Sequence, residues 1–202
     1  MTPVTRRVWL QAALALVAGA SWVRAHPRVK GVIGFIDKEG KLLFSNPDLH
    51  EAGKYSGGLA LACVHVDSRP KYGFVDRTGA FKIEPRFDTA SPFSEGRAFV
   101  VVRAEKRGGY IDENGKFLTD RPIESGGDFS EGLASFSEEG KIGYVDKTGK
   151  VAILPRFESA GPFREGAASA TLKGKCGYIS KDGSWLIEPR FEQGFPFSEG
   201  TP

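Results

Sequence analysis

The sequence has few of the residues from which catalytic centres are usually built. Its 202 residues include two Cys, three His and one Met. No HExxH or CxxC motif occurs, and no Ser or Cys lies in a nucleophile-elbow context near His26, His50 or His65. We therefore expect neither an enzyme nor a cofactor, and we assign no catalytic or metal-binding residue.

An excess of charge is also lacking once the first 25 residues are set apart. The whole chain carries 28 Lys and Arg against 25 Asp and Glu, but residues 1–25 hold three Arg and no acid. The remainder is balanced, which gives no electrostatic attraction for nucleic acid or for an anionic membrane. The charge pattern therefore argues against a nucleic-acid partner.

No apolar run is long enough to span a membrane. The longest, from Trp9 to Val23, falls short of the ~20 residues that a membrane helix needs. Small residues follow it and suit cleavage after Ala25, as in an export signal. We predict that residues 1–25 are such a signal, that the protein lies in the periplasm or cell envelope, and that no membrane span remains after cleavage.

The basic start of this segment resembles the twin-arginine export motif. In TRRVWLQ, Arg6, Arg7 and Leu10 match that motif, whereas Trp9 and Gln11 replace its Phe and Lys. A general secretory signal with two unrelated arginines and an uncleaved anchor are the alternatives.

What the sequence does have is a repeat. A motif of Gly, an aromatic residue, Ile or Val, usually Asp, two further residues and Gly occurs five times, at steps of 39, 36, 34 and 34 residues. We therefore interpret residues 26–202 as one array of five repeats, the last incomplete, with units that start near residues 31, 70, 107, 141 and 175. The copies are GFIDKEG from Gly34, GFVDRTG from Gly73, GYIDENG from Gly109, GYVDKTG from Gly143 and GYISKDG from Gly177.

Each unit is predicted to be β-structure, because Gly and Pro would break helices at every step. In the fourth unit we expect strands at residues 141–146, 150–154 and 167–172, with a Gly149 turn after the first and with Pro155 ending the second. The fold class is therefore all-β, an array of short antiparallel strands and hairpins. The pattern leaves open whether the array is a solenoid-like stack or is partly closed like a propeller.

Two further landmarks recur: Pro-Arg-Phe after the second strand, and Phe-Ser-Glu-Gly at the end of the following loop. Together with the hairpin motif they resemble the WG-repeat family of bacterial β-repeat proteins, from Gly31 to the end. The resemblance implies short antiparallel hairpins stacked side by side. The family's Trp is replaced in all five units, which favours a packing role for that position. The replacing residues are Ile33, Tyr72, Gly108, Ile142 and Cys176.

The loop residues are the candidate binding surface, since binding residues often lie on loops. The alternative is that they only join neighbouring units: each Phe as a plug, and each Arg, with Glu95, Glu131, Glu165 and Glu199, as a bridge. For Phe163 we expect the packing role. The candidate surface comprises Arg86, Phe87, Arg156, Phe157, Arg190 and Phe191.

Two other residue sets have mainly structural interpretations. Asp37, Asp76, Asp112 and Asp146 are expected to bond their own turns rather than calcium. Cys63 and Cys176 are expected to be separate buried thiols, because a disulfide would require the array to close on itself.

The favoured function is a non-enzymatic binding or scaffold module for a protein or peptide partner in the cell envelope. A glycan or peptidoglycan binder is the alternative, and an enzyme or cofactor protein comes third.

Overall fold

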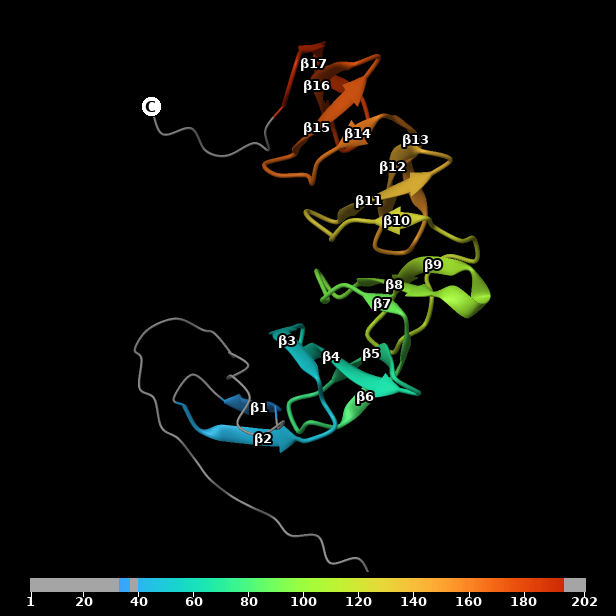
Figure 1. Ribbon diagram of the computed structural model, residues 1–202. Coiled ribbons are helices and arrows are strands. Elements are labelled where there is room, and N and C mark those ends of the chain that lie inside the picture. The colour runs from blue at the N-terminus through green and yellow to red at the C-terminus, as the bar shows by residue number, and fades with distance from the viewer. Residues whose placement is uncertain (1–32, 37–39, 195–202) are drawn as a thin grey trace, which may run out of the picture.

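The protein is an open arc of five small antiparallel β-sheets (Figure 1). The computed structural model describes residues 33–36 and 40–194, and all regular structure in them is β apart from a 3-10 turn at Arg103–Glu105. The all-β repeat fold is therefore confirmed, and the arc is not closed into a barrel. Sheets 1 to 5, which follow one another in chain order, comprise β1–β2, β3–β6, β7–β9, β10–β13 and β14–β17 respectively.

Within each sheet the strands are neighbours in the order in which they occur in the chain. The strands of sheets 1 to 3 are β1 (Ile33–Ile36), β2 (Leu42–Asn46), β3 (Glu51–Ser56), β4 (Leu59–Val66), β5 (Arg69–Val75), β6 (Phe81–Phe87), β7 (Thr89–Ala90), β8 (Ala98–Val102) and β9 (Arg107–Ile111). Those of sheets 4 and 5 are β10 (Ser125–Gly126), β11 (Leu133–Glu138), β12 (Lys141–Asp146), β13 (Val151–Phe157), β14 (Ser159–Ala160), β15 (Ala167–Leu172), β16 (Lys175–Ser180) and β17 (Trp185–Phe191).

The sheets are out of phase with the sequence repeat. The third strand of one unit pairs with the first hairpin of the next: β15 and β16 pair from Ala167 with Ser180 to Leu172 with Lys175. The two residues between them, Lys173 and Gly174, have φ of 54° and 72°, as a tight type I′ hairpin requires. Each complete sheet is therefore assembled from two successive sequence units.

The prediction that Pro155 ends its strand was wrong. β13 continues through Pro155 to Phe157, and a bulge absorbs the proline: three residues of β13 face one residue of β12 between the Tyr144–Ile153 and Ile142–Phe157 pairs. β13 is also the edge of its sheet, so the missing N–H of proline interrupts no ladder.

The bulge explains why the repeat motif begins with glycine. A Cβ on Gly143 would lie 2.6 Å from the carbonyl oxygen of Ile153 and 2.7 Å from the nitrogen of Pro155. Gly73 and Gly177 meet the same backbone atoms of their own bulges. In the third unit, which lacks Pro-Arg-Phe, a Cβ on Gly109 would have side chains rather than backbone as its nearest neighbours, the closest being Phe117 at 3.1 Å. The glycine is therefore required where the bulge is present.

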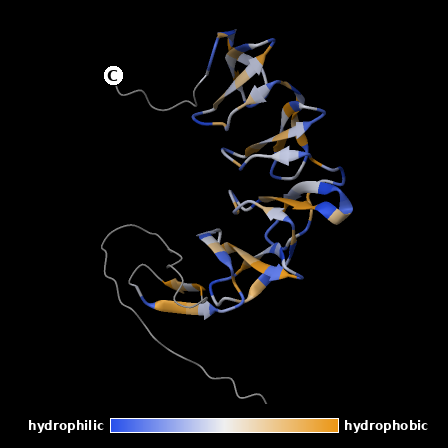
Figure 2. Ribbon diagram, viewed as in Figure 1, coloured by the Kyte–Doolittle hydropathy of each residue, from blue (hydrophilic) through white to orange (hydrophobic). Residues whose placement is uncertain are grey.

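Among residues 33–36 and 40–194, the core consists of four apolar clusters, one between each pair of successive sheets. Figure 2 shows the apolar residues on the strands and the hydrophilic ones at turns and loops. In β12 the two faces serve different clusters: Tyr144 packs toward sheet 5 and Val145 toward sheet 3. Sheets 2, 3 and 4 therefore each contribute to two of these clusters, whereas sheets 1 and 5 contribute to one.

Candidate binding site

Two of the phenylalanines in the candidate binding surface are not on the surface. Phe87 and Phe157 are 0 % exposed and belong to the clusters between sheets 2 and 3 and between sheets 4 and 5. Each ends its outer strand after the bulge, which turns the ring into the interface. Both are corrected to packing residues, whereas Phe191, in β17, is 38 % exposed.

The arginines that precede these phenylalanines join neighbouring sheets. Arg86 donates to the carbonyl oxygen of Gly115 at 2.7 Å, and Arg156 donates in the same way to Gly183. Each guanidinium also lies over the ring that follows it in the chain. Arg190 lies over Phe191, 5.1 Å from the ring centroid, and has no hydrogen-bond acceptor among the described residues.

The Phe that precedes Ser-Glu-Gly or Arg-Glu-Gly is a plug between sheets. Phe163 is 0 % exposed and meets the ring of Tyr144 in the preceding sheet, with centroids 4.8 Å apart. Phe129 meets Tyr110 at 5.1 Å in the same arrangement. The packing interpretation of Phe163 is therefore confirmed; Phe197 and Glu199 lie outside the described residues.

Two of the repeated glutamates, Glu95 and Glu131, bridge neighbouring units as expected, whereas no such bridge is seen for Glu165 among the described residues. Glu131 accepts from the backbone N–H of Gly166 and pairs with Lys181, both at 3.0 Å. Glu95 makes the same contacts with Gly132 and Lys147. The lysine hydrogen bond is the main reason why the pKa of each carboxyl lies below its usual value.

The turn aspartates bond their own turns. Asp146 accepts from Thr148 N at 2.8 Å and Lys150 N at 3.1 Å, and Asp76 accepts likewise from Thr78 and Ala80. Asp112 does the same for Asn114 and Lys116. Residues 33–36 and 40–194 contain no group of three or more His, Cys, Asp or Glu placed to hold a metal.

Both cysteines are buried, Cys63 in β4 of sheet 2 and Cys176 in β16 of sheet 5. The export-signal residues Arg6, Arg7, Leu10 and Ala25 lie outside the described residues, and so does Asp37. In the part of the chain that the structure describes, no helix is long and apolar enough to cross a membrane.

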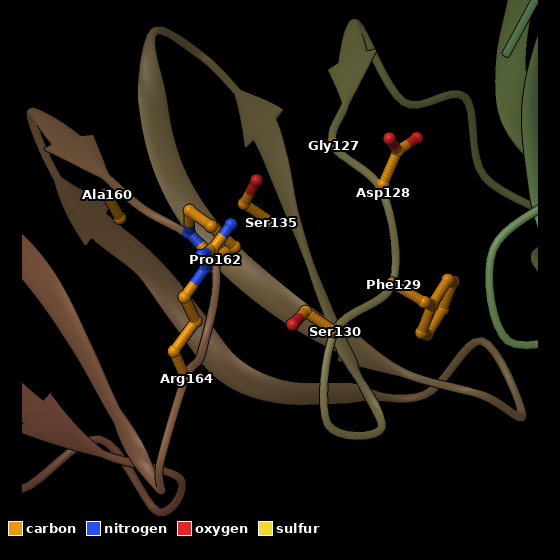
Figure 3. Close-up of a pocket in the computed structure, with 8 residues that line it drawn as sticks. All are labelled: Gly127, Asp128, Phe129, Ser130, Ser135, Ala160, Pro162 and Arg164. Carbon is orange, nitrogen blue, oxygen red and sulfur yellow. The ribbon is translucent and has the colours of Figure 1, made fainter. Parts of the chain in front are cut away.

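A cleft of about 360 Å³ lies between sheets 4 and 5 (Figure 3). Its walls are the loop from β10 to β11 and the loop from β14 to β15, which both project toward the inside of the arc (Figure 1). The volume is at the lower end of the range for ligand sites. The lining residues are Gly127, Asp128, Phe129, Ser130, Ser135, Ala160, Pro162 and Arg164.

Arg164 supplies the positive charge of this cleft. Figure 3 shows its side chain extending from the β14–β15 loop toward Ser135, while Asp128 stands on the opposite loop. Its guanidinium has no side-chain partner among the described residues. Ser130 holds the rim between the two sheets, because its hydroxyl donates to the carbonyl oxygen of Phe163 at 2.6 Å. The cleft thus combines two hydroxyls, those of Ser130 and Ser135, with the Arg164 cation in a lining that is otherwise largely apolar.

The sequence interpretation missed this site, although a signal was present. Arg164 occupies the place of Ser94 and Ser130 in the Phe-Ser-Glu-Gly motif. The Ser94 hydroxyl donates to the carbonyl oxygen of Phe129 at 2.7 Å, and the Ser130 hydroxyl donates to that of Phe163 at 2.6 Å. Arg164 replaces the serine of this joint, and this departure from the repeat marks the cleft.

Comparison with known proteins agrees with the repeat. The model of the family described as "WG containing repeat" matches residues 72–103, 109–141, 142–176 and 177–201. Because these matches cover more than half of the sequence, the chain belongs to the WG containing repeat family. No curated protein matches the chain.

Several solved structures are distantly similar. The acylaminoacyl peptidase of Pyrococcus horikoshii is 13 % identical, with a TM-score of 0.48, over 84 % of this chain and 33 % of the peptidase. A protein of unknown function from Bacteroides caccae is 14 % identical, with a TM-score of 0.32, over 78 % of this chain and 74 % of that protein. The tricorn protease is 12 % identical, with a TM-score of 0.25, over 87 % of this chain and 20 % of the protease. The chain spans about a third of the first of these proteins.

Proposed function

We propose that the protein is an exported, non-enzymatic binding module that holds a protein or peptide partner in the cell envelope. The observation that carries the proposal is the cleft between sheets 4 and 5, where Arg164 has no side-chain partner within residues 40–194 and lies near the hydroxyls of Ser130 and Ser135. The joints between sheets use Glu95, Glu131, Arg86, Arg156, Phe87 and Phe157, whereas Arg164 departs from the repeat and is available to a partner.

A peptide segment suits the chemistry of this cleft. A backbone N–H of an extended peptide can donate to the Ser130 hydroxyl oxygen, the Ser135 hydroxyl can donate to a peptide carbonyl, and a carboxylate on the peptide matches Arg164. A glycan binder would use exposed aromatic faces for stacking. Phe129, the one aromatic residue of the cleft, is only 3 % exposed and therefore offers no such face.

The test uses short linear peptides displayed on phage and selected on the full chain. An enriched peptide is then synthesised, and its affinity is measured for the parent protein and for Arg164→Ser, which restores the family motif. Loss of a charged hydrogen bond of about 1.5–3 kcal/mol predicts roughly 10- to 150-fold weaker binding.

Arg121→Ser is the matched control, because Arg121 is an exposed arginine that pairs with Glu138 and does not line the cleft. It should leave the affinity unchanged. Failure to enrich any peptide, or equal affinities for the parent protein and Arg164→Ser, would refute the proposal. Cell-wall fragments that bind the protein when peptides do not would favour the glycan alternative.

A further inference from the structure

The two ends of the arc carry opposite halves of an interface that is repeated inside it. At the joint between sheets 4 and 5, the preceding sheet contributes Phe157 and Arg156 and the following sheet contributes Trp185 and Gly183. The Phe157 and Trp185 rings meet edge to face, with centroids 5.7 Å apart, and Arg156 donates to the Gly183 carbonyl oxygen. The turn glycine also packs on Ile153: a Cβ on Gly183 would lie 3.1 Å from its Cγ2.

Sheet 1 exposes the residues that correspond to those of the following sheet in this joint, and no described residue packs against them. Ile36 is half-buried, although its counterparts Val75, Ile111, Val145 and Ile179 are all 0 % exposed. Leu42, which occupies the place of Trp185, is 52 % exposed. A Cβ on Gly40 would meet no described atom within 4 Å, whereas a Cβ on each later turn glycine would meet the preceding sheet or, for Gly149, Leu118 in the segment that follows β9. We call Ile36, Gly40 and Leu42 the head face.

Sheet 5 exposes the residues that correspond to those of the preceding sheet in this joint. Ile187 is half-buried, whereas its counterparts Ile83 and Ile153 are 3 % and 4 % exposed. Phe191 is 38 % exposed, whereas Phe87 and Phe157 are 0 % exposed. Arg190 has no acceptor among the described residues, although Arg86 and Arg156 each bond a turn glycine. We call Ile187, Arg190 and Phe191 the tail face.

We propose that the tail face of one copy of the chain binds the head face of another. Phe191 then packs on Leu42 of the second copy as Phe157 packs on Trp185, and Arg190 donates to the Gly40 carbonyl oxygen as Arg156 does to Gly183. Each contact continues an interface that the fold already makes. Because the two faces differ, one bound pair still has a free head and a free tail, so the association produces rings or longer chains.

The experiment is sedimentation velocity on the full chain over a series of concentrations. The mass should rise with concentration from the 21.9 kDa of one chain to at least twice that value. Phe191→Arg, which blocks the tail, and Leu42→Arg, which blocks the head, should each remain at the mass of one chain.

Leu154→Arg is the matched control, since Leu154 is 73 % exposed and belongs to neither face. It should associate as the parent protein does. An equimolar mixture of Leu42→Arg and Phe191→Arg should form pairs and nothing larger, because only one intact head and one intact tail are present. A milder variant, Arg190→Ala, should weaken association at least tenfold if the large substitutions disturb folding.

A parent protein that keeps the mass of one chain at every concentration would refute the proposal. So would association that survives Phe191→Arg and Leu42→Arg, or a mixture of these variants that does not pair. None of these residues lines the cleft of Arg164, so the result is independent of the peptide-binding test.

Discussion

Phe163 offers the most direct test of the plug arrangement. Its ring is 0 % exposed and lies 4.8 Å from that of Tyr144, in a cluster shared with Phe157 and Ile179. Phe163→Ala empties this position between two sheets, and the range for truncating a core aromatic is about 3–5 kcal/mol. Small domains unfold with about 5–15 kcal/mol in total, so the expected loss is a large share of the stability.

The measurement is urea denaturation, followed both by circular dichroism and by tryptophan fluorescence. The variant should unfold at a much lower urea concentration with an unchanged slope, which separates lost stability from a change in the unfolded state. The Ser130 hydroxyl still finds its acceptor, because it bonds the backbone carbonyl of Phe163 rather than the ring. The decrease in the free energy of unfolding therefore measures the packing of the Phe163 ring and not the loss of this hydrogen bond.

Leu154→Ala is the control, since this apolar side chain is 73 % exposed and should cost within about 0.5 kcal/mol. If Phe163→Ala unfolds at the same urea concentration as Leu154→Ala, the ring is not a plug. The argument that the loop phenylalanines hold the sheets together would then fail.

Three further predictions concern the bulge, alkaline pH and export. Gly143→Ala should destabilise the protein by about 1–3 kcal/mol, because its Cβ meets rigid backbone, while Gly109→Ala should cost less because the Phe117 side chain can move; urea midpoints compare the two. Burial raises the pKa of Tyr144 above its ordinary value, so its contribution is complete below about pH 10 and is lost as the pH rises further. Tyr144→Phe should therefore flatten the alkaline fall of stability, and an equally steep fall would contradict this. Replacing Arg6 and Arg7 by Lys should block export, measured by cell fractionation, whereas unimpaired export would leave the general secretory route.

The elements were predictable because their signals are local. A period-2 strand and a Gly turn define each hairpin wherever they occur, so β12 and β15 were predicted with the bounds that the structure has. The Glu131 bridge was expected for a similar reason: a residue repeated at equivalent positions meets equivalent neighbours.

The predictions for Pro155 and Phe157 were wrong because they depend on how neighbouring strands pair, which a local sequence rule does not describe. Proline ends a strand when its missing N–H is needed, but Pro155 sits in an edge bulge where no partner is lost. The same bulge turns Phe157 into the core, and nothing in the residue order alone reveals that rotation. Which strands share a sheet was equally hidden, because every unit offers the same pairing partners.

The cleft could not be found from the motif, since it arises where two loops from different sheets face each other. Only the departure at Arg164 marked the place, and its meaning depends on what the serines do at equivalent joints. The sequence thus shows that Arg164 differs from the serines of the other units, and the structure shows that it lines the cleft.

The offset between sheets and sequence units affects how this array can be shortened or extended. A cut at a sequence border, such as before Lys141, separates β11 from β12 and divides sheet 4 into two halves with open edges. A cut at Glu158 passes between β13 and β14 and leaves both sheets complete. Between Gly109 and Gly177, where the steps are 34 residues, insertion or removal of one whole period should keep the strand pairings, because each half-sheet then meets an equivalent partner. The array can therefore change in length by whole periods while its sheets remain intact.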